Sequence, residues 1–439
     1  MRSRLTVPAL APILLFGTAL PARAQTEPTR ELTVDACVAI AITHNADVLA
    51  SNADVRGAEA ARAGVGGQFA PKIHADGAVQ QWNGPWDLSF GGAAIRARNA
   101  FTWSAGATLS EPILGLWQIY DEYKVRDFGV DVAAIARAAT RRQIAFETID
   151  AYYRLLEVSR LSEVAEASIF QLTAQEKQAQ SLYANGVIGK NDLLRATLAL
   201  SSARQRAIQA RGAITIERGR LARAMGISPD APLEPVPFTG EPPPPGEPSL
   251  ASAEAHALSR RLELRQIARQ IEQADAGVGA AQTKLLPQIN AVGNFTHVAG
   301  SLLAQANAAY VGVVGSWDVW DWGTTASGIG EADALLARAR QARKKIESQV
   351  LTEAQQAFVD AETAHEKLGV AREAVEQAEE NYRIVSKKFE NNAATSFDMV
   401  DAEALLTQAR AQVQTALYDY LIARAALDRA TGAALPGAP

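Results

Sequence analysis

The stretch that decides the fold is Ala70-Pro71-Lys72-Ile73, which has an echo later in the chain at Leu286-Pro287-Gln288-Ile289. In both places a proline ends a helical pattern, and proline also drives the residue before it into extended backbone. Both quartets therefore predict a passage from helix to strand. The correspondence continues far beyond them, for example from Gly226 to Gly432. The chain is predicted to be a tandem duplication.

The duplication gives the domain organisation. We expect a first structural repeat over residues 25–228 and a second over 249–432, each ordered as helix, β-hairpin, long helix and helix. A flexible tail over 433–439 would follow. Residues 229–248 form a proline-rich linker that includes Pro242-Pro243-Pro244-Pro245. Proline at this density prevents helix formation and gives a stiff, extended spacer.

The start of the chain predicts export. Two arginines precede an apolar stretch from Leu5 to Leu20, and Ala22-Arg23-Ala24 follows as a cleavage site, so residues 1–24 are predicted to be a secretory signal peptide. No later run reaches the roughly 18 apolar residues of a transmembrane helix. The lone cysteine, Cys37, cannot form an internal disulfide and is expected to be buried on a helix.

Two helical stretches are unusually long, at about 115–183 and about 322–390. About 70 residues at ~1.5 Å each make a rod of roughly 100 Å, whereas helices in globular proteins average about 11–12 residues. Small apolar residues recur every three or four positions, as in helices packed side by side. A soluble coiled coil would show the same pattern. The other helices are expected at about 33–69, 191–226, 249–285 and 397–431, with Thr33 and Ser249 as N-caps and Gly226 and Gly432 as C-caps.

Each repeat also predicts two strands in which apolar and polar residues alternate. The apolar positions are Ile73, Ala75, Gly77 and Val79; Phe101, Trp103, Ala105, Ala107 and Leu109; Ile289, Ala291, Gly293 and Phe295; and Val311, Val313, Trp317 and Val319. A longer Gly/Trp-containing loop is expected between Gln81 and Phe101. Such alternation fits a half-buried soluble sheet or the wall of a membrane barrel.

Three observations favour the barrel. The chain carries an export signal, nothing else in the sequence could cover the apolar face, and aromatic residues mark both ends of the strands as an interfacial girdle would. These aromatics are Trp82, Trp86, Phe101 and Trp103 at one end and Trp317, Trp320 and Trp322 at the other. Barrels in membranes have at least about eight strands, so the barrel must be shared between chains, and a trimer would supply twelve strands.

Taken together, these features resemble the TolC-like outer-membrane efflux protein family over nearly all of the mature chain. The most specific pieces are the two helix-to-strand junctions, Ser110–Gly115 with its echo Trp320–Gly323, and the segment Phe389–Ala402. The resemblance implies an α+β membrane protein, a homotrimer with a twelve-stranded outer-membrane β-barrel continued by a long periplasmic α-helical barrel. It also implies outer-membrane lipid, a periplasmic adaptor and an inner-membrane pump as partners, with the linker in an equatorial belt.

The resemblance also implies the functional residues. The pore constriction and gate would comprise Asp398, Asp401, Asp192 and Phe389, and the adaptor would dock on the helix tips at Asn185, Gly186, Val187, Asn391, Asn392 and Ala393. A ring of carboxylates around a narrow pore attracts cations and raises some of the carboxylate pKa values. Alternatively, Asp398 caps a helix whose first turn contains Asp401.

The two tips are not equivalent, and the gate departs from the family pattern. Asp192 is expected at the corresponding cap of the first repeat, but Arg195 stands where Asp401 does. Phe389 stands where the family has a gate tyrosine, and Ala394 where it has an arginine. The closed state must therefore be held by other contacts.

No pattern of catalytic chemistry emerges. The five histidines lie far apart, at His44, His74, His256, His297 and His365, without metal-ligand spacing, and no phosphate-binding or nucleophile motif occurs. The formal charge is −5 with no basic block, which gives no footing for nucleic acid. We expect no enzyme, cofactor or metal site.

The leading hypothesis is a passive exit duct of a tripartite efflux pump for small molecules. A type I protein secretion duct of the same family is an alternative, and a soluble periplasmic coiled-coil interaction protein is a rival from another class.

Overall fold

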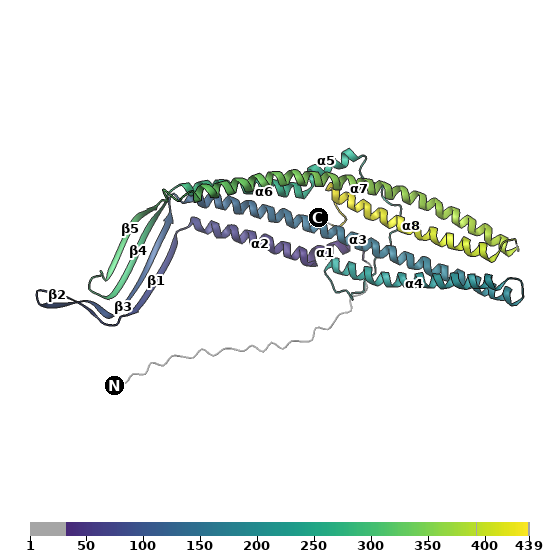
Figure 1. Ribbon diagram of the computed structural model, residues 1–439, viewed down its shortest axis with the longest axis horizontal. Coiled ribbons are helices and arrows are strands. Elements are labelled where there is room, and N and C mark those ends of the chain that lie inside the picture. Colours follow the sequence, from purple (N-terminus) through teal and green to yellow (C-terminus); the bar gives the residue numbers. More distant parts are fainter. Residues whose placement is uncertain (1–31, 392, 438–439) are drawn as a thin grey trace, which may run out of the picture.

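The computed structural model of this protein describes residues 32–391 and 393–437. The molecule is elongated: a curved sheet lies at one end, and two pairs of long helices extend away from it (Figure 1). The predicted signal peptide, residues 1–24, lies outside the described residues.

The two predicted rods are confirmed. Helix α3 spans Leu116–Ala184 and α7 spans Thr324–Glu390, with 69 and 67 residues. Each turns back into a shorter partner of 36 residues, α4 at Lys190–Met225 and α8 at Ser396–Thr431. We call α3 with α4 the first hairpin and α7 with α8 the second hairpin. Both point away from the sheet (Figure 1).

The helix that precedes the strands is broken in both repeats, which corrects the prediction of one continuous helix. The pieces are α1 (Val34–His44), α2 (Ala46–Gly66) and η1 (Gly67–Phe69), then α5 (Leu250–Arg260), α6 (Leu262–Gln282) and η2 (Thr283–Leu285). At the first break Asn45 is extended, its side chain accepts from Asp47 N at 2.8 Å, and its Nδ2 donates to Ala224 O at 2.9 Å. Arg261 takes the same extended backbone at the second break. Thr33 and Ser249 are the N-caps predicted.

Within the described part of the chain, no single helix has the length and apolar character needed to cross a membrane. Only the bent pair Val34–His44 and Ala46–Phe69, with a bend of 46°, meets that requirement jointly by length and composition.

The sheet is antiparallel in the order β1-β3-β4-β5. Its strands are β1 (Lys72–Gln81), β3 (Ala93–Pro112), β4 (Gln288–Ser301) and β5 (Asn307–Ser316), with the short β2 (Trp86–Phe90) paired to the first part of β3. The loop predicted between Gln81 and Phe101 was therefore wrong in part. Gly91 and Gly92, both at positive φ, make the two-residue turn of an extra hairpin. The fourth strand ends at Ser316, before the predicted Val319.

The predicted alternation is confirmed by the register. Ile73 pairs with Leu109, Leu109 with Gly293, and Gly293 with Val311, so the apolar positions form continuous rows on one face. That face is uncovered, since Ile73 is 78% and Val311 90% exposed. On the other face Asn294 Nδ2 donates to Thr108 Oγ1 at 2.9 Å.

The aromatic residues lie at the two ends of the sheet, as predicted. Phe101 and Trp103 pair with Gln81 and Val79, at the end of β1 that is remote from the helices. At the helical end Trp317 Nε1 donates to Leu285 O at 3.2 Å, and Trp320 and Trp322 contact each other edge to face at 5.8 Å. All three of these tryptophans are exposed.

The core lies midway along the molecule, where the linker crosses the helices. The Tyr152 hydroxyl donates to Leu32 O at 3.1 Å and to Val236 O at 2.7 Å. The Tyr420 hydroxyl donates to Pro243 O. The linker is thus fastened to α3 and to α8. Around these contacts packs an apolar cluster that includes Leu155, Leu156, Leu221, Met225, Tyr418 and Leu421.

The tail predicted to be flexible is held against the helices as far as residue 437. Leu435 is 4% exposed and packs with Val38 of α1 and Ile149 of α3, so its apolar side chain is part of a buried cluster. Arg142 Nη2 also donates to Ala433 O.

Candidate functional site

The free ends of the two hairpins bring the predicted gate and docking residues to one end of the molecule (Figure 1). At the first tip, α3 ends at Ala184 and Gly186 follows at φ 69°. This left-handed conformation lets Val187 N donate to Leu182 O at 2.9 Å. Asn185 Nδ2 donates to Ser181 O at 2.8 Å, so the side chain also closes the helix end.

The second tip is built in the same way. Asn391 Nδ2 donates to Lys387 O at 2.8 Å, and Ala393 N donates to Lys388 O at 2.7 Å. Asn392, the residue that corresponds to Gly186, lies outside the described residues. Phe389 is half-buried in the last turn of α7. The predicted docking residues Asn185, Gly186, Val187, Asn391 and Ala393 are all exposed.

Asp398 and Asp401 lie on the first turns of α8, exposed on the protomer. Thr395, and not Asp398, is the N-cap of this helix. Its Oγ1 accepts from Asp398 N at 3.2 Å, while Asp398 Oδ2 accepts from Thr395 N at 2.8 Å and from Thr395 Oγ1 at 2.7 Å. Asp398 is therefore the acidic partner of a capping box. The backbone and side-chain hydrogen bonds from Thr395 lower the pKa of Asp398.

The first tip lacks this capping box. The N-cap of α4 is Gly189, which has no side chain to accept a hydrogen bond, and Asp192 lies half-buried three residues on. The expectation that Asp192 is the cap was wrong, because glycine stands where the second tip has Thr395. The structure thus confirms that the tips differ.

One contact between the tips had not been predicted. The guanidinium of Arg195 on α4 lies over the ring of Phe397 on α8, 4.9 Å from the ring centroid. Such a contact contributes about 0.5–1 kcal/mol at an exposed site. It joins the two hairpins at the place where the gate contacts implied by the resemblance are missing. Sequence alone offered no signal for it, since the two residues belong to different repeats.

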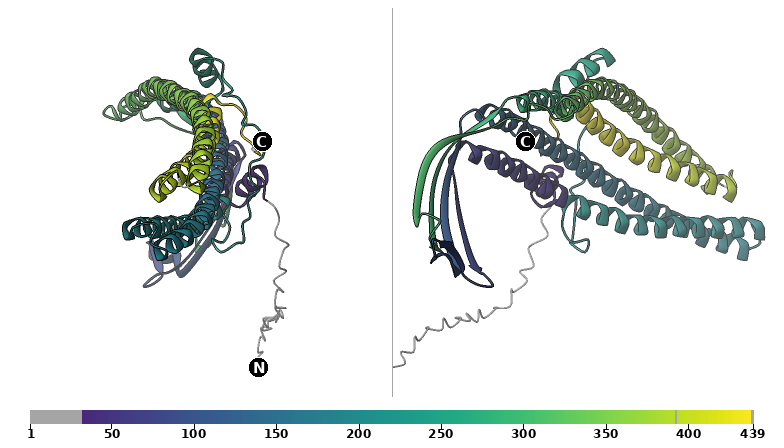
Figure 2. Two further views of the ribbon diagram at one scale, coloured as in Figure 1. Left: turned by 90° about the vertical axis from the view of Figure 1, so that its right-hand side faces the viewer. Right: turned by 60° about the vertical axis from the view of Figure 1, so that its left-hand side comes forward.

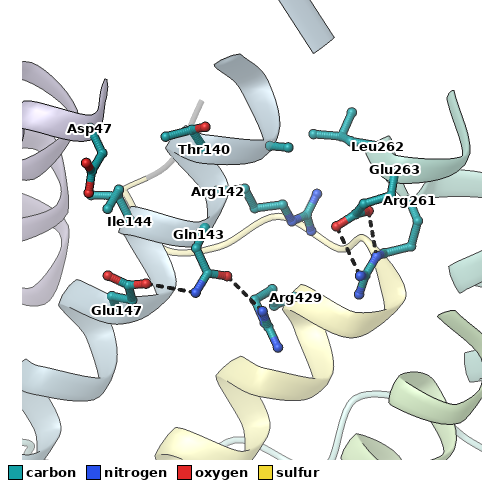
Figure 3. Close-up of a pocket in the computed structure, with 11 residues that line it drawn as sticks. Asp47, Thr140, Arg142, Gln143, Ile144, Glu147, Arg261, Leu262, Glu263 and Arg429 are labelled. Carbon is teal, nitrogen blue, oxygen red and sulfur yellow. Dashed lines mark hydrogen bonds and ion pairs between the residues drawn. The ribbon is translucent and has the colours of Figure 1, made fainter. Parts of the chain in front are cut away.

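A cavity of about 480 Å³ lies where α2, α6 and α8 meet the middle of α3 (Figure 3). The arginines of its lining are held by ion pairs and hydrogen bonds. Arg261 Nη2 binds Glu353 at 2.7 Å, Arg261 Nε binds Glu263 at 2.8 Å, and Arg429 Nη1 donates to Gln143 Oε1 at 2.8 Å. Arg142 pKa is lowered by burial and by the neighbouring Arg261. We interpret this cavity as the structural junction of the helices.

Over residues 32–391 and 393–437, no group of three or more His, Cys, Asp and Glu side chains is arranged to hold a metal ion.

Comparison with known proteins shows which family this chain resembles. The family model described as outer membrane efflux protein matches residues 38–227 and 255–433. Nodulation protein T of Rhizobium leguminosarum bv. trifolii is 22% identical over 311 residues, which cover 68% of this chain and 64% of that protein. The chain thus spans just under two thirds of this relative's length.

Two solved structures share the fold. The outer-membrane channel OprN has a TM-score of 0.78 at 20% identity, over 92% of this chain and 90% of that one. The outer membrane protein VceC of Vibrio cholerae has a TM-score of 0.78 at 16% identity, over 92% and 96%. The resemblance found in the sequence is confirmed. The chain therefore belongs to the outer membrane efflux protein family, a family of efflux ducts, and its place is the outer membrane.

Proposed function

We propose that this chain is one protomer of a homotrimeric, passive exit duct. Three sheets would close into a twelve-stranded barrel in the outer membrane, and the long helices would continue it as an α-helical barrel in the periplasm. In this assembly residues 25–228 and 249–432 are the two structural repeats, and the linker 229–248 forms an equatorial belt.

The observation that carries this proposal is the incomplete sheet. In the described residues, edge strands β1 and β5 each pair on one side only, and unpaired edges invite pairing with another chain. The apolar face is also bare, as Val79 at 73% and Val313 at 67% exposure show. Such a face is costly in water, whereas bilayer lipid covers it without penalty. Closure with further copies of the chain would pair the backbone groups of the two edge strands, and lipid would cover the apolar face.

The second tip would form the constriction. Threefold symmetry brings Asp398 and Asp401 of each protomer around the axis, where their mutual repulsion and negative potential favour cations over anions. Asp192 and Phe389 would lie beside this ring. The exposed turns at Asn185–Val187 and Asn391–Ala393 would be the docking surface for a periplasmic adaptor, and an inner-membrane pump would supply the energy for small-molecule efflux.

The test is single-channel recording of the purified protein in planar bilayers, with and without Asp398→Ala/Asp401→Ala. The proposal predicts cation-selective steps that lose selectivity or rise in conductance in the double variant. Asp47→Ala, an exposed carboxylate midway along the molecule, is the control and should leave selectivity unchanged. Steps unaffected by the double variant would move the constriction elsewhere. A protein that is monomeric and soluble without detergent and that gives no steps would contradict the duct itself.

A further inference from the structure

A buried carboxyl group lies between the two hairpins. Glu403 on α8 is 1% exposed, and it occurs on the inward stripe that contains Met399, Leu406 and Ala402. We call the contact between the first hairpin and the second hairpin the seam. Figure 2 shows the two hairpins as separate helix pairs. A glutamate at a core position is uncommon, because a buried charge is costly unless it is paired.

The hydrogen-bond partners of Glu403 come from both sides of the seam. Thr407 Oγ1, one turn along α8, donates to its Oε1 at 3.0 Å. The side-chain amide of Gln171, on α3 of the first hairpin, lies 2.8 Å from Oε1 and 2.5 Å from Oε2, and donates when its nitrogen faces the carboxyl group. The contact between Gln171 and Glu403 therefore joins the first hairpin to the second.

No ion pair neutralises Glu403 within the described residues. Arg410 of α8 is bound to Glu379 at 2.8 Å, and Arg206 of α4 acts on Glu403 only over a longer distance. From α7, Tyr382 faces the same site, with its own pKa raised by burial and by Glu403. Burial raises the pKa of Glu403, and these hydrogen bonds and arginines offset it only in part.

The amide of Gln171 can serve either protonation state. Toward an ionised Glu403 it presents its nitrogen as donor, and toward a protonated Glu403 it presents its oxygen, which accepts the carboxyl proton. The distance of 2.5 Å between the Gln171 amide and Glu403 Oε2 permits a hydrogen bond in both protonation states. The bond across the seam is therefore kept in both states, but only the neutral state avoids the cost of a buried charge.

The layer around Glu403 is also a polar part of the seam. Besides Gln171, Ser168 of α3 contacts Glu403, and Gln175 of α3 contacts Tyr382 of α7. Nearer the linker, by contrast, the two hairpins meet through apolar and aromatic side chains such as Leu155 and Tyr418, each 1% exposed. Water can hydrate the groups of a polar layer when it separates, so such a layer opens more easily than an apolar one.

We propose that Glu403 is a proton-controlled lock, which holds the second hairpin on the first when it is neutral and releases it when it is ionised. The role rests on the proposed function, since it makes the lock a control on the tips of the duct. Separation hydrates Glu403, which then has the ordinary glutamate pKa of about 4.3. The packed state is therefore fully favoured below that value and loses its advantage as the pH rises toward the raised pKa of the packed form. Acid closes the tips.

A short-range fluorescence pair at the tips tests this without any channel current. Arg195→Cys labelled with bimane and Phe397→Trp place fluorophore and quencher where the native side chains are 4.9 Å apart. Native tryptophans extend no further along the chain than Trp322, at the sheet end, and Cys37 is removed as Cys37→Ala. We expect quenching at acid pH that is relieved as the pH rises. With Glu403→Gln, quenching should persist at every pH, because that side chain stays neutral.

Two further variants make the test specific. Thr407→Val keeps the shape of the side chain and removes a donor that stabilises ionised Glu403 in the packed state. The hairpins should therefore separate at lower pH than in the parent; this variant also stands in if Glu403→Gln does not fold. Glu366→Gln, an exposed glutamate on α7, should follow the parent profile. The lock is refuted if quenching in the parent does not depend on pH, or if Glu403→Gln or Thr407→Val keeps the parent midpoint. Absence of conductance with this titration intact would instead count against the duct.

Discussion

Gly226→Ala should destabilise the structure around Gly226, in the middle of the molecule, far more than Gly186→Ala destabilises the first tip. Both glycines have φ 69° at a helix end, but their surroundings differ. A Cβ on Gly226 would lie 2.5 Å from His44 O and 2.8 Å from Asn45 Cα, both backbone atoms at the break between α1 and α2, whereas a Cβ on Gly186 meets nothing within 4 Å.

The magnitudes follow from this difference. A left-handed alanine costs about 1–2 kcal/mol, less about 0.4–1 kcal/mol for the stiffer unfolded chain, and both variants share this net cost. Forced displacement of packed backbone adds about 1–3 kcal/mol at Gly226 alone. Since about 1.4 kcal/mol is a factor of ten, amide exchange around Gly226 should accelerate by roughly ten-fold or more beyond any change around Gly186.

Hydrogen exchange followed by mass spectrometry is the assay, because it reports local opening in a chain that is too large to unfold in one step. Gly226→Ala should raise exchange at the end of α4 and at the break near Asn45. Gly186→Ala should affect only the first tip. Equal acceleration around the two sites would refute the argument that contact with His44, and not the glycine conformation, decides the cost.

The remaining predictions concern the core and the cap of α8. Tyr152→Phe removes the hydroxyl donor to Val236 O, while Leu32 O still accepts from Val236 N, so it should destabilise the linker contact by about 0.5–1.5 kcal/mol, seen as faster linker proteolysis. Leu155→Ala, at 1% exposure, should cost about 2–5 kcal/mol and lower the temperature of thermal unfolding; an unchanged temperature would contradict its place in the core. The lowered pKa of Asp398, due to the hydrogen bonds from Thr395, means that its stabilisation of α8 is present above the ordinary aspartate pKa and is lost as the pH falls through the lowered one. Asp398→Asn should abolish this acid-dependent fraying, measured by exchange of the first turn of α8.

Much of the fold was accessible to sequence reasoning because its signals are local. Pro71 and Pro287 mark the junctions, Gly226 and Gly432 end helices, and the period-two pattern gives the sheet its apolar face. The break at Asn45 was missed because a contact with Ala224 O stabilises it, and that contact joins residues far apart in sequence. The β2 hairpin does have a local signal, the turn Gly91-Gly92.

The candidate site was predictable only in part. Asp398 and Asp401 were found on the correct turns of α8, but the cap was assigned to the wrong residue because Thr395 competes for it. Glu403 also had a signal, a charged residue on an apolar stripe with Met399 and Leu406. Its burial depends on Gln171 from the other repeat, a pairing that no local pattern encodes.

Cross-linking of the two open edges of the sheet tests whether three chains close one barrel. Ala75→Cys on β1 and Val311→Cys on β5 are combined in a Cys37→Ala chain, which is then treated in detergent with a bismaleimide. A barrel closed by three chains predicts covalent species that extend to the trimer and stop there. The control pair, Ala75→Cys with Ala105→Cys on the inner strand β3, should give no such ladder. A doubly substituted edge variant that stays monomeric, or a ladder that continues beyond the trimer, would contradict a closed barrel shared by three chains.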